Sequence, residues 1–250
     1  MYLTLSGRIL EASERRPSAL EFVALAKEAG YDGVGLRGWQ LPPENTQEDP
    51  ADIKACLEDA GLCVSSITVP AAAVELTAPF ARELNAKVLQ VSGSVSELAG
   101  AAVHLDDDMR LGPQMHTGGE FETVALAAET LARIADPRVG VVVEPANHMF
   151  AGETWSEDLF KPIAERIIGC NLQSIEVGQG EQSLKLCDGS TRVYRRVPAR
   201  ENTQADFHGF FAALRAAGYD GYVNVIEPAS KTGSIEFFAR ETADYMSELL

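Results

Sequence analysis

The sequence is short of positive charge. Its 250 residues include 21 Lys and Arg against 37 Asp and Glu, which gives a formal net charge of −16 at pH 7. Proteins that bind nucleic acids or anionic membranes need a basic face to neutralise phosphates. The composition therefore argues against both kinds of partner. It is compatible with an enzyme that acts on a small substrate, or with a cation-binding site.

Cysteines and long apolar runs are also scarce. The four cysteines, Cys56, Cys63, Cys170 and Cys187, form no Cys-x-x-Cys pair. We therefore expect reduced thiols in a cytoplasmic protein, without a disulfide framework or a cysteine metal cluster. No apolar run approaches the roughly 18 residues of a membrane-spanning helix. The first residues have no basic stretch ahead of an apolar core, as a secretory signal would.

Short apolar runs alternate with helical patterns along the chain. Strands are predicted at residues 3–5, 34–36, 64–69, 87–91, 141–143, 172–177 and 222–226. Helices are predicted at residues 19–29, 50–60, 72–85, 120–134, 156–168, 207–217 and 235–249. This alternation predicts parallel β/α architecture, first of all a single (β/α)8 TIM-type barrel domain over residues 1–250. A doubly wound sheet is the alternative, but no Gly-x-Gly-x-x-Gly follows the first strand.

An internal repeat supports this architecture. Residues 29–34 read Ala-Gly-Tyr-Asp-Gly-Val and residues 217–222 read Ala-Gly-Tyr-Asp-Gly-Tyr. Each segment lies between a predicted helix and a predicted strand. The pattern is typical of a helix that stops at glycine, a tight turn and a buried strand.

One region departs from the alternation. The predicted strand ending at Val177 and the next strand-like run, residues 183–186, are too close to be parallel neighbours. Residues 183–186 and 192–197 instead predict a β-hairpin with a glycine-containing turn. The barrel is thus expected to be irregular, or to lack one helix, around residues 178–200. Arg192, Arg195 and Arg196 form a basic cluster on this hairpin, suited to a subunit contact or a ligand contact.

Three carboxylates stand at the ends of predicted strands: Glu144, Glu176 and Glu227. In β/α barrels the active site lies at this edge. A carboxylate leaving an apolar strand is costly to bury unpaired. Three that converge would need a cation between them, and oxygen ligands suit Mg²⁺ or Mn²⁺. The alternative for each is a pairing with arginine or a cap on the next helix.

Several segments around these residues resemble motifs of the xylose isomerase-like TIM barrels, a superfamily of sugar isomerases, sugar epimerases and family 2 AP endonucleases. They are residues 144–148 (Glu-Pro-Ala-Asn-His), 171–179, 186–189, 197–201 and 218–228. The resemblance implies that Glu144 and Glu227 hold a divalent metal and exchange a proton with the substrate, with Glu176 as the third ligand. Mn²⁺ or Mg²⁺ is expected, with Zn²⁺ and Co²⁺ as alternatives.

The activity implied is isomerisation or epimerisation of a sugar, sugar phosphate or keto acid through an enediolate. Departures from the family pattern support an alternative. Gly35 stands where the family carries a Glu, and Gln179 and Lys185 stand where it carries ligand histidines. The alternative is a degenerate, metal-free barrel that acts as a non-catalytic binding subunit, with Lys185 neutralising the acidic site. A DNA-repair nuclease is disfavoured by the net charge and by the small number of histidines, four in all.

Further residues near strand ends are candidates for substrate binding. Arg37 is the natural partner of a substrate phosphate or carboxylate. The full set is Arg37, Trp39, Gln90, Asn147, His148, Gln179 and Lys185. Residues 104–108 and 115–119 are expected in a solvated connection, with a lid as the alternative. We expect a small carbohydrate substrate and leave self-association into a homodimer open.

Overall fold

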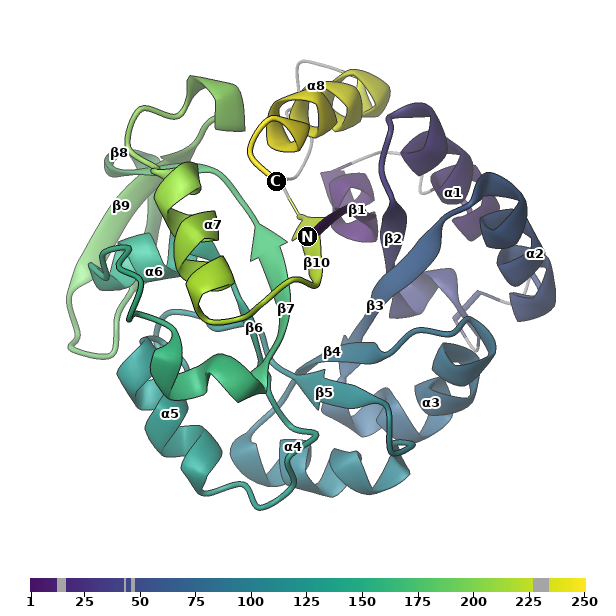
Figure 1. The fold of residues 1–250 in the computed structure, drawn as a ribbon, viewed down its shortest axis with the longest axis horizontal. Coiled ribbons are helices and arrows are strands. Elements are labelled where there is room, and N and C mark those ends of the chain that lie inside the picture. The colour runs from purple at the N-terminus through teal and green to yellow at the C-terminus, as the bar shows by residue number, and fades with distance from the viewer. Residues whose placement is uncertain (13–16, 43, 46–47, 227–233) are drawn as a thin grey trace.

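The computed structural model describes residues 1–12, 17–42, 44–45, 48–226 and 234–250 (Figure 1). Within them, eight parallel strands form one sheet in the order β5-β4-β3-β2-β1-β10-β7-β6. The strands are β1 (Tyr2–Ser6), β2 (Gly33–Arg37), β3 (Cys63–Pro70), β4 (Val88–Ser92), β5 (Arg110–Gly112), β6 (Val141–Val143), β7 (Ile167–Leu172) and β10 (Tyr222–Val225). Parallel bridges Leu111–Val139 and Gln114–Val142 join the two edges of the sheet. The predicted TIM-type barrel is confirmed.

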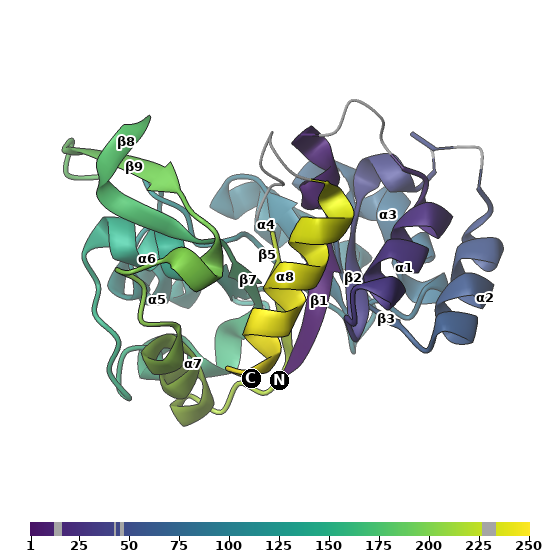
Figure 2. The same cartoon turned by 90° about the horizontal axis from the view of Figure 1, so that it is seen from above.

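Helices surround the ring of strands (Figures 1 and 2). They are α1 (Ala19–Glu28), α2 (Pro50–Ala60), α3 (Val74–Glu83), α4 (Val95–Ala101), α5 (Val124–Ala132), α6 (Pro145–Ala151), α7 (Phe207–Ala216) and α8 (Ile235–Ser247). Their starts are encoded locally. Ser18 and Glu21 form a reciprocal capping box on α1, and Asp49 caps α2 just ahead of a proline.

The repeated segments have the predicted conformation. Gly30 and Gly218 have φ angles of 86° and 80°, in the left-handed region that favours glycine. After each glycine, a tyrosine N–H reaches back to a carbonyl in the last turn of the helix, and a strand of the ring follows shortly. A shared local signal thus ends two helices and starts β2 and β10.

The irregular region contains an antiparallel hairpin of β8 (Ile175–Lys185) and β9 (Thr191–Arg196), as predicted. Between β8 and α7, the described chain has only one short helical turn, Ala199–Glu201. The hairpin stands above the end of the ring opposite the N-terminus (Figure 2). It packs on α6 through a small apolar cluster, in which the rings of Phe150 and Tyr194 meet edge to face at 4.9 Å.

Several elements differ from the sequence prediction, and α4 and α6 have no counterpart among the predicted helices. The strand predicted at residues 172–177 is β7 at Ile167–Leu172, and the helix predicted at 156–168 is reduced to a 3-10 segment, Lys161–Arg166. Gly169 and Asn171 hid this strand, because neither residue type favours strands. The ring gives a reason for Asn171, whose side chain hydrogen-bonds inside the barrel.

A further difference is β5, which lies in the region expected to be a connection. Its three residues form too short a run to stand out in the sequence, and its partners on β4 and β6 are what define it as a strand. In the described parts of the chain, no helix combines the length and the apolar character needed to cross a membrane.

Candidate functional site

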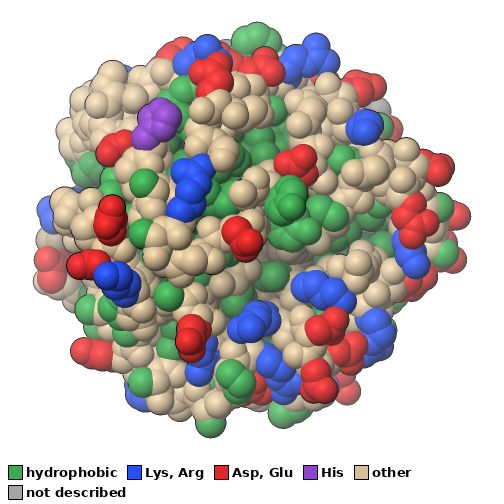
Figure 3. Space-filling model, in the orientation of Figure 1, with side chains coloured by type: hydrophobic (Ala, Val, Ile, Leu, Met, Phe, Trp, Pro, Cys, Tyr) green, Lys and Arg blue, Asp and Glu red, His purple; other side chains and the backbone are tan. Residues whose placement is uncertain are grey.

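A cavity of about 550 Å³ opens at the carboxyl ends of the strands. Hereafter it is called the cavity. Its lining includes these charged and amide side chains: Arg8, Arg37, Gln90, Gln114, Glu144 and Arg196. The hairpin closes one side with Leu184 and Tyr194. Figure 3 shows the opposite end of the molecule, where the N-terminus lies, and acidic and basic side chains are interspersed on that face rather than gathered by sign.

Glu144 follows β6 and caps the N-terminus of α6. One of its carboxylate oxygens accepts from the Ala146 N–H at 3.0 Å. The other accepts from the Asn147 N–H at 3.2 Å and from the Asn147 side-chain amide at 2.5 Å. The side chain is 1% exposed, yet it lines the cavity. The helix-capping alternative therefore holds for Glu144, and it leaves a buried, firmly oriented carboxylate at the wall of the cavity.

A layer of neutral polar side chains crosses the barrel interior. The Thr4 hydroxyl donates to Asn224 at 3.2 Å, and the Asn224 amide donates to Asn171 at 3.3 Å. The Asn171 amide then donates to Gln90 at 2.9 Å and to Gln114 at 2.7 Å. Thr4, Asn224 and Asn171 lie side by side in the register of their strands. The layer is thus a connected network, and its glutamines form part of the cavity lining.

Gly35 makes room for this layer. A Cβ atom at position 35 would lie 2.7 Å from both terminal atoms of the Asn224 amide. Position 35, where the family resemblance implies a Glu, is therefore faced here by the side chain of Asn224 from β10, which β1 separates from β2 in the sheet. A side chain at position 35 and the amide of Asn224 would compete for the same space.

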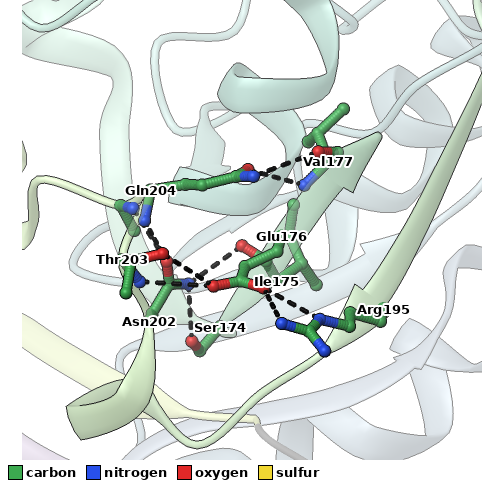
Figure 4. A network of polar contacts seen from close by, with 9 residues as sticks. Ser174, Ile175, Glu176, Val177, Arg195, Asn202, Thr203 and Gln204 are labelled. Atoms are coloured by element: carbon green, nitrogen blue, oxygen red, sulfur yellow. Dashed lines mark hydrogen bonds and ion pairs between the residues drawn. The ribbon is translucent and has the colours of Figure 1, made fainter. Parts of the chain in front are cut away.

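Glu176 is not among the residues that line the cavity. Figure 4 shows it turned to Arg195 and Thr203 instead. Its carboxylate accepts from Arg195 at 2.8 Å and 2.5 Å and from the Thr203 hydroxyl at 3.0 Å. Arg195 is the first cause of a lowered pKa for Glu176, and hydrogen bonds from Thr203 add to it. The pairing with arginine that the sequence left open is what occurs. Glu176 ties the hairpin to the segment before α7 and is not brought to Glu144.

The other predicted residues divide into two groups. Arg37, Gln90 and Asn147 line the cavity. Among those that do not, His148 is buried between aromatic rings and its Nδ1 contacts Glu153 at 2.6 Å, a structural position. Trp39 packs on the core, and Gln179 and Lys185 are exposed on β8. Glu227 lies outside the described residues.

Sequence reasoning missed Arg8 and Gln114, and it left Arg196 between two interpretations. Arg8 follows β1, a strand-end position that could have been found by the same rule as Arg37. Gln114 follows β5, the strand that was not predicted. Arg196 reaches the cavity only because the hairpin folds back over the barrel.

The described residues do not by themselves form the predicted metal centre, and one of its expected ligands, Glu227, lies outside them. Among the residues that the structure describes, no three His, Cys, Asp or Glu side chains are grouped closely enough to hold a metal ion. Around Glu144 the lining consists of amides and guanidinium groups rather than further carboxylates. The described residues therefore do not fit a three-carboxylate metal site.

Comparison with known proteins agrees with the fold. The family model described as xylose isomerase-like TIM barrel matches residues 23–249. A xylose isomerase domain protein from Alicyclobacillus acidocaldarius is 19% identical, with a TM-score of 0.77 over 100% of this chain and 98% of that one. D-psicose 3-epimerase from Clostridium cellulolyticum H10, solved with D-tagatose, is 11% identical, with a TM-score of 0.77 over 100% and 99%.

A xylose isomerase-like TIM barrel/4-hydroxyphenylpyruvate dioxygenase fusion protein is 15% identical, with a TM-score of 0.71. The match covers 97% of this chain and only 41% of the fusion protein, so the chain corresponds to one part of that molecule. No curated protein sequence matches the chain.

The contact between Gly35 and Asn224 predicts an effect on stability. Gly35→Ala should destabilise the fold by about 1–3 kcal/mol, because the new methyl group displaces an amide held in a network. Gly100→Ala is the matched control. Position 100 is in α4 with open space around it, so this change should stabilise by about 0.5–1 kcal/mol. Urea unfolding measures the change in the free energy of unfolding for both variants. Equal changes would contradict the conclusion that a side chain at position 35 displaces Asn224.

The ion pair of Glu176 predicts a pH dependence. A carboxyl group with a lowered pKa in the folded state adds stability above its unfolded pKa, and this is lost as the pH falls through the folded pKa. The wild type should therefore lose stability on acidification below about pH 4.5, and Glu176→Gln should lose less over the same range. Urea unfolding at a series of pH values measures this. Glu181→Gln, exposed on the same strand, should behave as wild type; an unchanged Glu176→Gln curve would refute the assignment.

Proposed function

Because the chain belongs to the xylose isomerase-like TIM barrel family, we propose that it isomerises or epimerises a polyhydroxylated carbonyl compound by proton transfer. The observation that carries the proposal is the buried carboxylate of Glu144 on the wall of a 550 Å³ cavity at the carboxyl edge of the barrel. This is the edge at which β/α barrel enzymes place their catalytic groups.

In the proposed reaction, Glu144 takes a proton from the carbon next to the substrate carbonyl. The electron pair of the broken C–H bond forms an enediolate, and a proton returns to the neighbouring carbon or to the opposite face. Three N–H donors hold the Glu144 carboxylate in one orientation, which reduces the motion that must be frozen during the reaction. Glu227, predicted from the sequence as the second acid/base group, remains part of the proposal.

Substrate hydroxyls would be bound by the amides of the cavity. Gln90, Gln114 and Asn147 each line it. An amide both donates and accepts hydrogen bonds, so it suits hydroxyl groups, which do the same. Since Gln90 and Gln114 are anchored by Asn171, their amides are positioned before the substrate binds.

The divalent metal expected from the family resemblance, Mn²⁺ or Mg²⁺, has no matching ligand set among the described residues. The proton transfer proposed for Glu144 does not use a metal ion. Charge that develops on the substrate oxygen is met by the hydrogen-bond donors of the cavity itself.

The role of Glu144 predicts that Glu144→Gln slows turnover by about 10²–10⁴-fold, since a positioned general base contributes that much. The assay offers ketoses and ketose phosphates in D₂O and follows deuterium incorporation beside the carbonyl by NMR. Glu181→Gln removes the same charge from an exposed position and should keep the wild-type rate of exchange. Circular dichroism confirms that both variants fold.

Two outcomes would contradict the proposal. Deuterium exchange in Glu144→Gln at the wild-type rate would show that Glu144 is not the general base. Tight substrate binding without any exchange in the wild type would favour the non-catalytic binding barrel instead. The same assay with a chelator tests whether the proton transfer needs a metal ion. Exchange that is retained with the chelator supports the proposed step. Exchange that is lost with the chelator and restored by Mn²⁺ would overturn it.

A further inference from the structure

His116 lies beside Glu144 at the carboxyl edge of the barrel. A parallel bridge pairs Gln114 with Val142, and the Met115 N–H donates to the Val142 carbonyl at 2.8 Å. His116 is two residues beyond Gln114, and Glu144 is two residues beyond Val142. Both side chains line the cavity. Since neighbouring strands are about 4.8 Å apart, the imidazole and the carboxylate start from adjacent positions on one wall of the cavity.

The hydrogen bonds of His116 determine which of its ring nitrogens carries the proton. Its Nδ1 atom is 3.0 Å from the Thr117 carbonyl oxygen and 3.4 Å from the Thr117 hydroxyl oxygen. A carbonyl oxygen only accepts hydrogen bonds, so Nδ1 carries the proton of the neutral ring. The Nε2 atom then has a free lone pair, and within the described chain it has no hydrogen-bond partner. The ring can therefore take a proton at Nε2, while the Thr117 carbonyl stabilises the charge that results.

The backbone is held on both sides of His116, although the imidazole itself is exposed. Before it, the Met115 side chain is completely buried. After it, the Gly118 N–H donates to the buried carboxylate of Glu122 at 2.6 Å. Glu122 also accepts from the Cys187 N–H, in the turn of the hairpin, at 2.8 Å. The imidazole thus projects from an anchored segment, as a positioned proton carrier must.

We propose that the reaction is an isomerisation, in which Glu144 moves the carbon-bound proton and His116 moves the oxygen-bound proton. The inference rests on the proposed function, and it selects one of the two reactions left open there. An isomerisation moves the carbonyl group to the next carbon, so a hydroxyl proton must pass from one oxygen to the other. An epimerisation leaves the carbonyl group in place and needs no such transfer. Because His116 and Glu144 reach the substrate from the same wall, the pair suits the first reaction and not an inversion at carbon.

The steps balance for a ketose with its carbonyl at C2. Glu144 takes a proton from C1, the electron pair of that C–H bond forms the C1–C2 double bond, and the carbonyl pair moves onto O2. The Nε2 atom of His116 takes the proton of the O1 hydroxyl and gives it to O2. The electron pair left on O1 forms the new carbonyl, and the pair of the double bond takes the proton back from Glu144 at C2. The product is the aldose, and both side chains return to their starting protonation states.

Deuterium exchange and aldose formation, followed together by NMR in D₂O, separate the two roles. The probes are D-fructose, D-xylulose and D-fructose 6-phosphate, with the full chain. His116→Ala should slow aldose formation by about 10²–10⁴-fold, the contribution of a positioned proton carrier. Deuterium incorporation beside the carbonyl should fall by less than about tenfold, because Glu144 still removes and returns the carbon-bound proton. Imidazole added to His116→Ala should restore part of the aldose formation, since position 116 is open to solvent.

Two further variants make the result specific. His116→Gln keeps a polar side chain that cannot carry a proton, so it should behave like His116→Ala. His208→Ala is the matched control, because His208 is also exposed but is not among the described residues that line the cavity. It should keep both rates of the wild type. Circular dichroism and unfolding curves confirm that each variant is folded.

Aldose formation at the wild-type rate in His116→Ala would overturn the inference. So would an equal loss of aldose formation and exchange that imidazole does not restore, since a purely structural role predicts that result. A wild type that exchanges deuterium but forms only the epimer would overturn the inference and leave the proposed function intact. Absence of exchange in the wild type would contradict the proposed function itself, and Glu144→Gln should lose both rates.

Discussion

Every strand of the ring runs in the same direction, and the rest of the molecule depends on this constraint. In a closed parallel sheet, the residues that follow the strands are all delivered to one edge. Arg8, Arg37, Gln114 and Glu144 are far apart in the sequence, yet each leaves a strand at that edge and lines the same cavity. The backbone hydrogen bonds of the ring therefore determine the composition of the site.

The interior of the ring accepts polar groups because they satisfy one another. A buried amide without a partner costs on the order of 1–3 kcal/mol. Asn171 avoids this by donating to both Gln90 and Gln114, while its oxygen accepts from Asn224. Gly35 has no side chain, and this leaves the space that the Asn224 amide occupies. The same network thus occupies the space beside position 35 and holds the amides of Gln90 and Gln114.

The hairpin shows how one pair of neighbouring residues can serve two purposes. Arg195 neutralises the buried Glu176 on one face of β9, and Arg196 reaches the cavity on the other. The ion pair fixes the position of the strand, which in turn fixes the guanidinium group in the site. A carboxylate that the sequence suggested as a metal ligand is instead paired with arginine on the hairpin.

The sequence by itself determined the features that depend on neighbouring residues. Helix caps such as Ser18 with Glu21, the glycine turns at Gly30 and Gly218, and the hairpin before α7 follow from local backbone preferences. It also placed Glu144 at the end of an all-valine strand, and the structure puts this carboxylate on the cavity wall. Only the tertiary structure decided the position of β7, the pairing of Glu176 and the convergence of the arginines. These depend on which side chains meet across the ring and the hairpin, and residues distant in sequence carry no local signal of that contact.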